Sequence, residues 1–104
     1  MKKITAAITA VGKYLPEYVL TNEILEEMVD TTSDWILTRT GIKERRILKG
    51  VGKGSSFMAI RAANDLFTKT KVNPEEIDLV IIATATPDMK AASTAAFVAT
   101  EIGA

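Results

Sequence analysis

The 104-residue sequence contains no cysteine and no histidine. Their absence excludes a disulfide framework, a catalytic thiol and the imidazole that most often serves as a general base, and it removes the ligands that zinc prefers. An excess of charge of one sign is also missing, because 13 lysines and arginines balance 13 aspartates and glutamates. A chain without net charge has no overall field to hold nucleic acid or an anionic membrane surface. Any anion-binding site must therefore be local, and we expect no metal site.

Long hydrophobic runs are absent as well. No apolar segment approaches the ~20 residues needed to cross a bilayer, so no membrane partner is expected. The N-terminal stretch MKKITAAITAVGKYLPEY has two lysines and small residues, which raises the possibility of a signal peptide. Threonines and a glycine dilute its short apolar run, so we interpret it as part of the folded protein. Together with the lack of cysteine, this favours a cytoplasmic protein.

The distribution of apolar and helix-terminating residues predicts alternating strands and helices. Two apolar, β-branched runs at 4–11 and 78–84 predict strands buried on both faces. Capping residues and apolar stripes predict helices from Thr21 or Asn22 to Met28, from Thr32 or Ser33 to Gly41, over about 56–70, as one turn at 73–76, and over Thr94–Ile102. Residues 42–48 look extended. This alternation is typical of an α/β fold with a mostly parallel sheet flanked by helices, and the unit is expected to be incomplete.

The stretch 31–46, TTSDWILTRTGIKERR, contains the only tryptophan of the chain, Trp35. Arg39 follows four residues later, so the two side chains share a face of the predicted helix. An indole offers a flat surface to a nucleobase, and a guanidinium can bind a phosphate through two donors. A lone tryptophan is also a common core anchor, and Arg39 could pair with Asp34 or Glu44 at the surface. The residues alone leave these alternatives open.

Four segments in order carry a resemblance to a known family. They are ITAVGKYLPEYVLTNEILEEMVDTTSDWILTRTGIKERR, the predicted helix around MAIRAANDLF, PEEIDLVIIATATPD and STAAFVATEIGA, and SDWILTRTGIKERR is the most specific part. Together they resemble the N-terminal part of β-ketoacyl-acyl-carrier-protein synthase III, a thiolase-fold condensing enzyme. The resemblance covers nearly the whole chain and implies that residues 1–104 are the N-terminal part of the first thiolase-like domain.

The resemblance implies an acyltransferase that starts fatty-acid synthesis by condensing an acyl-coenzyme A primer with malonyl-acyl carrier protein. The family uses a cysteine, a histidine and an asparagine that lie in later parts of its sequence. No catalytic residue is therefore expected in this chain, which alone should be inactive. Coenzyme A thioester would be a substrate and not a permanent cofactor, and the full protein would be a homodimer.

Four residues receive roles through the resemblance. Trp35 matches the tryptophan that stacks on the adenine of coenzyme A, and Arg39 matches the arginine that meets its phosphate. Thr31 matches a position near the adenine. Ala91 stands where many members have a bulky residue that enters the partner's acyl pocket, which implies room for a longer or branched primer.

Other patterns have simpler explanations. The cations Lys43, Arg45, Arg46, Lys49 and Lys53 could form a docking patch for an acidic carrier protein, but such a run is more often a solvated face. Glycines 50, 52 and 54 lack the spacing of a dinucleotide-binding loop. Two rival functions remain: another thiolase-fold synthase that uses coenzyme A, and a non-catalytic coenzyme A-binding or interaction domain.

Overall fold

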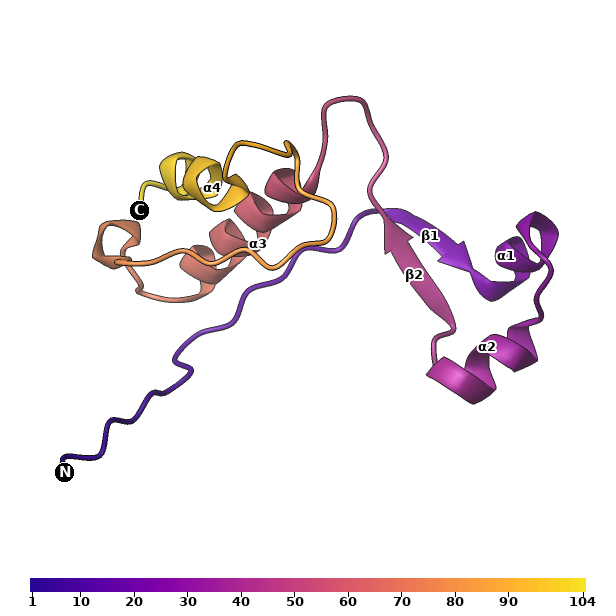
Figure 1. Ribbon diagram of the computed structural model, residues 1–104, viewed down its shortest axis with the longest axis horizontal. Coiled ribbons are helices and arrows are strands. Elements are labelled where there is room, and N and C mark those ends of the chain that lie inside the picture. Colours follow the sequence, from indigo (N-terminus) through magenta and orange to yellow (C-terminus); the bar gives the residue numbers. More distant parts are fainter. The chain divides into compact units, whose positions relative to one another are not determined.

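The computed structural model describes residues 1–104, which form two compact units. One unit consists of residues 15–53, and the other combines residues 1–14 with residues 54–104. Figure 1 traces the chain through both units. No helix has both the length and the apolar character needed to cross a membrane.

The unit of residues 15–53 contains a two-stranded sheet and two short helices. Strand β1 (Tyr18–Thr21) pairs antiparallel with β2 (Glu44–Ile47), as Figure 1 shows. Helix α1 (Asn22–Met28) starts directly after β1, and Thr21 Oγ1 caps it by accepting the Ile24 N–H at 3.3 Å. Helix α2 (Ser33–Thr40) follows and contacts neighbouring α1. The two helices therefore occupy the connection between the paired strands.

The other unit is built on the pair of helices α3 (Ser55–Lys69) and α4 (Thr94–Ile102). A single 3-10 turn, η1 (Pro74–Glu76), lies between them in the sequence. Val98 of α4 is almost fully buried and forms part of the small core. Gly54, which precedes α3, has no side chain to cap the helix. The Asp88 carboxylate caps it instead, because it accepts the Ser56 N–H at 2.9 Å and also the Ser56 hydroxyl.

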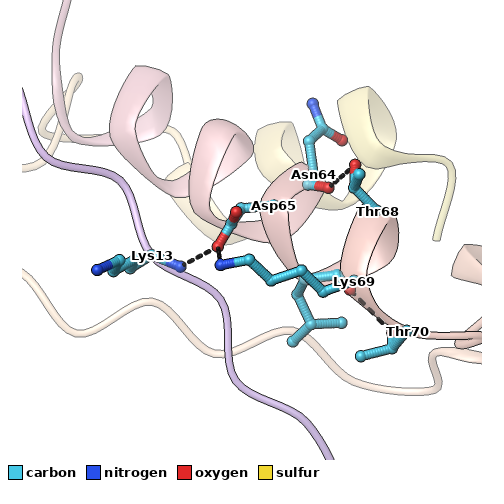
Figure 2. Close-up of polar contacts among 7 residues, drawn as sticks. Lys13, Asn64, Asp65, Thr68, Lys69 and Thr70 are labelled. Carbon is cyan, nitrogen blue, oxygen red and sulfur yellow. Dashed lines mark hydrogen bonds and ion pairs between the residues drawn. The ribbon is translucent and has the colours of Figure 1, made fainter.

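The N-terminal segment is tied to α3 through a carboxylate. Asp65 Oδ2 accepts the Lys13 backbone N–H at 2.9 Å and lies 2.6 Å from Lys69 Nζ, as Figure 2 shows. One residue earlier in the segment, a Cβ on Gly12 would lie only 2.3 Å from the Ala62 carbonyl oxygen. Only glycine therefore fits this close approach to α3.

The predicted helices are confirmed, with ends within about one residue of those expected. The cap residues Thr21, Thr32, Asn73 and Ser93 each accept a backbone N–H, which explains why these ends were visible in the sequence. The extended segment 42–48 is confirmed as β2. Strand β1 was not predicted.

The predicted strands at 4–11 and 78–84 are wrong for this chain, because neither segment pairs with a strand. The mostly parallel sheet is likewise not formed, and the one sheet present is the antiparallel pair β1 and β2. The physical reason is the lack of a neighbour: Ile4 is 95% exposed and Ile81 is 78% exposed. Apolar, β-branched composition favours a buried strand, but a strand exists only where a second backbone completes its hydrogen bonds.

Candidate functional site

The helix α2 presents the two residues singled out by the sequence. The Arg39 guanidinium carbon lies 4.5 Å from the centre of the Trp35 ring, as expected for side chains one helical turn apart. Trp35 is 52% exposed, so the indole is not a core anchor in this unit. Arg39 faces the indole instead of pairing with Asp34 or Glu44. The helix thus offers an aromatic face and a cation at one surface.

A cavity opens beside the indole. It has a volume of about 390 Å³ and is lined by Asp30, Thr31, Thr32 and Trp35. Thr31 is half-buried in its wall, so the structure brings together Trp35 and Thr31 as well as Trp35 and Arg39. The wall combines a flat aromatic surface with hydroxyl and carboxylate oxygens, a composition that suits a ligand with an apolar ring and polar edges.

Local hydrogen bonds hold both ends of α2. At its start, Thr32 Oγ1 accepts the Trp35 N–H at 3.2 Å, and the Glu26 carboxylate accepts the Ser33 N–H. At its end, Gly41 has φ +70°, and its N–H donates to the Leu37 carbonyl at 2.8 Å. A left-handed residue at this position suits glycine and stops the helix. The Trp35 backbone is therefore fixed by the same capping bond that starts the helix.

The candidate docking patch of cations loses support from these contacts. Arg45 donates to Asn22 and to the Leu20 carbonyl, and Arg46 donates to the Pro16 carbonyl. Lys49 lies with its Nζ 3.4 Å from the centre of the Tyr18 ring. Arg45, Arg46 and Lys49 therefore contact groups of their own unit, which the run of cations in the sequence did not indicate.

Ala91 lies in the exposed loop before α4, in the other unit. A small cavity of about 120 Å³ lies next to this loop, but Ala91 is not among its lining residues, which are Ser56, Asp88, Met89, Ala92, Ser93, Thr94 and Phe97. The Ser56 hydroxyl and then the Ser56 N–H hold the pKa of Asp88 below its usual value. Asp88 is thereby explained as a helix cap, and the cavity offers no pair of groups for acid–base chemistry.

No cluster of three or more acidic side chains forms a candidate metal site. Two polar residues next to the candidate site, Asn22 and Arg45, have a role that the sequence pattern does not indicate. The sequence marks Asn22 only as a possible helix cap and Arg45 only as one cation of a run. The burial of Asn22 and its partner on β2 depend on pairing across the sheet.

No protein-family model matches the chain. Among known proteins, "Beta-ketoacyl-[acyl-carrier-protein] synthase III" of Porphyromonas gingivalis is 59% identical over 103 residues, which is 99% of this chain and 31% of that protein. "Beta-ketoacyl-[acyl-carrier-protein] synthase III 2" of Bacteroides thetaiotaomicron is 54% identical over the same shares. The chain therefore spans about a third of the length of these relatives.

Solved structures similar to this chain are also synthases of this kind. The 3-oxoacyl-[acyl-carrier-protein] synthase III of Aquifex aeolicus matches 90% of this chain with a TM-score of 0.79 and 47% identity, over 30% of its own length. The priming β-ketosynthase of the R1128 polyketide pathway also gives a TM-score of 0.79, at 33% identity and over 28% of its length. The predicted resemblance and the α/β, thiolase-like class of the fold are thereby confirmed.

Proposed function

We propose that this chain supplies the nucleotide-binding surface of a beta-ketoacyl-[acyl-carrier-protein] synthase III. The proposal starts from the homology of the chain to the N-terminal part of such enzymes. In this proposal the full-length protein condenses an acyl-coenzyme A primer with malonyl-acyl carrier protein and so starts fatty-acid synthesis. The chain is the N-terminal part of its first thiolase-like domain. The full protein is a cytoplasmic homodimer that needs no permanent cofactor.

The observation that carries the proposal is the exposed Trp35 face beside Arg39 and an open cavity. The adenine of coenzyme A stacks on the indole, where base–aromatic stacking contributes about 1–3 kcal/mol. The Arg39 guanidinium binds a phosphate of the same ligand through charge-assisted hydrogen bonds. Thr31 lines the same cavity as Trp35, and in this proposal its side chain contacts the stacked base.

The chemical steps belong to residues outside this chain. Without cysteine or histidine, residues 1–104 offer neither a thiolate to accept the acyl group nor an imidazole to stabilise the enolate. We therefore expect the chain alone to be inactive. Incubation with radiolabelled acetyl-coenzyme A tests this, and stable covalent labelling of the 104-residue chain would contradict it.

The rival functions have less support. A non-catalytic domain does not account for identity of 59% and 54% to condensing enzymes along 99% of the chain. A different thiolase-fold synthase would form a different product, so product analysis distinguishes it from the proposed enzyme. Released carbon dioxide and a 3-oxoacyl-acyl carrier protein identify the proposed reaction.

The nucleotide-binding surface is tested in the full-length protein by comparing two acyl donors. Acetyl-coenzyme A carries the nucleotide, whereas the acetyl thioester of N-acetylcysteamine carries the same reactive group without it. Trp35→Ala should raise KM for acetyl-coenzyme A about 5- to 150-fold, the equivalent of losing ~1–3 kcal/mol of stacking. KM for the short donor should not change.

Thr38→Ala is the matched control, because Thr38 is exposed on the same helix and its hydroxyl bonds only the Asp34 carbonyl. This variant should leave both donors unaffected. An equal loss for both donors in Trp35→Ala, or no loss for either, would reject a nucleotide site at the indole.

For the acyl pocket, we propose that Ala91 admits primers longer or more branched than acetyl. Its side chain is small and its loop is exposed in this chain. Turnover of the full-length enzyme with acetyl-, isobutyryl- and hexanoyl-coenzyme A measures the preference. A strict acetyl preference would reject this role, and Ala91→Phe should narrow the range if the role is real.

A further inference from the structure

Asn22 is a buried polar residue at the point where β1 becomes α1. Its side chain is only 1% exposed, although asparagine is usually found at the surface. A buried amide is costly unless its oxygen and both N–H groups have partners. The hydrogen-bond partners of Asn22 lie in α2, in β2 and in the segment between them, so this residue connects the parts of its unit.

The Asn22 amide nitrogen reaches both ends of α2. Nδ2 donates to the Ile42 carbonyl at 2.9 Å, just after the glycine that ends the helix, and to the Ser33 hydroxyl at 3.4 Å, at the first residue of the helix. The Asn22 backbone N–H adds a bond to the Lys43 carbonyl at 3.2 Å. A single side chain therefore ties the beginning and the end of the helix that carries Trp35 and Arg39.

Arg45 on β2 holds the other side of the amide. Both of its terminal nitrogens, Nη1 and Nη2, lie 3.0 Å from Asn22 Oδ1, and Nη1 also lies 3.3 Å from the Leu20 carbonyl. Since a guanidinium can only donate, it requires the amide oxygen on its own side and so turns the NH₂ group toward α2. Arg45 thus fixes the orientation in which Asn22 can bind the helix.

We propose that Asn22 and Arg45 are positioning residues for nucleotide binding. They touch no ligand, but they set where α2 stands and hence where the indole and the Arg39 guanidinium lie. Position matters here because α2 has only eight residues, and a helix this short depends on its tertiary contacts. The inference rests on the proposed function, since it assigns these two residues to the same nucleotide site.

The test uses the full-length protein with Asn22→Asp and Arg45→Lys. Aspartate has the same shape and keeps the acceptor for Arg45, but it has no N–H to donate to the Ile42 carbonyl and places an oxygen against that carbonyl. Lysine keeps the charge of Arg45 but cannot donate the paired bonds. For each variant we expect KM for acetyl-coenzyme A to rise about tenfold, the order of effect of losing one buried hydrogen bond.

The short donor separates positioning from general damage. The acetyl thioester of N-acetylcysteamine lacks the nucleotide, so its KM and kcat should stay unchanged in both variants. Arg46→Lys is the matched control, because Arg46 lies on the same strand but donates to the Pro16 carbonyl and not to α1 or α2. This control should show no selective loss with either donor.

Each outcome decides the question. Equal losses with both donors, or no loss with either, would overturn the positioning role of Asn22 and Arg45. If Asn22→Asp does not fold, Arg45→Lys decides by the same comparison. Trp35→Ala is measured in parallel: if it discriminates between donors and the two variants do not, only the positioning inference fails, whereas if Trp35→Ala does not discriminate, the proposed function fails.

Discussion

The Arg39 guanidinium has two possible partners, and their energies predict how strongly its loss should weaken coenzyme A binding. Without ligand it lies 4.5 Å from the centre of the Trp35 ring, an exposed cation–π contact that contributes about 0.5–1 kcal/mol. A hydrogen bond to a charged group contributes more, about 1.5–3 kcal/mol. The contact with the phosphate is therefore the more favourable one, and the Arg39 guanidinium should turn from the indole to the phosphate when the ligand binds.

The net effect follows from the difference between these two contacts. If the guanidinium gives up the indole to reach the phosphate, Arg39→Met should cost about 0.5–2.5 kcal/mol of binding free energy. That corresponds to a dissociation constant for coenzyme A about 2- to 70-fold higher. Arg39→Lys keeps the charge without the paired donors and should fall between the wild type and the methionine variant.

Isothermal titration calorimetry of the full-length protein with coenzyme A measures this change at low and high salt. The wild type should lose affinity as salt rises, and Arg39→Met should lose less, since it lacks the screened contact. Lys43→Met is the matched control, because it removes one cation from a nearby exposed position without touching the indole. Equal dissociation constants for Arg39→Met and Lys43→Met would refute the phosphate contact.

Three further predictions concern the folded units and are measured by thermal unfolding of the full-length protein. Thr32→Ala removes the cap of α2 and should cost about 1 kcal/mol, with Thr32→Ser as the rescuing control; an unchanged melting temperature would contradict the cap. Gly12→Ala places a methyl group 2.7 Å from the Leu66 Cβ and should destabilise by about 1–3 kcal/mol, whereas Gly52→Ala, with nothing within 4 Å of its added methyl, tests left-handed strain alone; equal losses would refute the close approach. The hydrogen bond from the Lys69 side chain and then that from the Lys13 N–H lower the pKa of Asp65 from its ordinary value of 3.8. The ionised Asp65 carboxylate therefore stabilises the fold fully above pH 3.8, and this stabilisation is lost as pH falls through the lower pKa of the folded state. The stability difference between wild type and Asp65→Asn should therefore disappear in acid below pH 3.8, and a difference that stays constant there would disprove the coupling.

The helix ends of this protein could be predicted because their determinants are local. Thr32 accepts the N–H three residues ahead, and Gly41 adopts the left-handed conformation that ends α2. Such bonds lie within one or two turns, so sequence spacing alone reveals them. The same locality placed Trp35 and Arg39 on one helix face, and the composition alone removed thiol and imidazole chemistry from the chain.

Burial and pairing, by contrast, were decided only by the tertiary structure. The runs at 4–11 and 78–84 have the composition of buried strands, yet they form none, because strand formation requires a second backbone at hydrogen-bonding distance. Whether the lone indole would be core or surface likewise depended on what packs around α2. The Asn22–Arg45 contact joins residues 23 positions apart, and the cap of α3 by Asp88 spans 32 positions. Sequence therefore determined the local turns of this protein, while the contacts that hold its candidate site in place arose only when distant segments met.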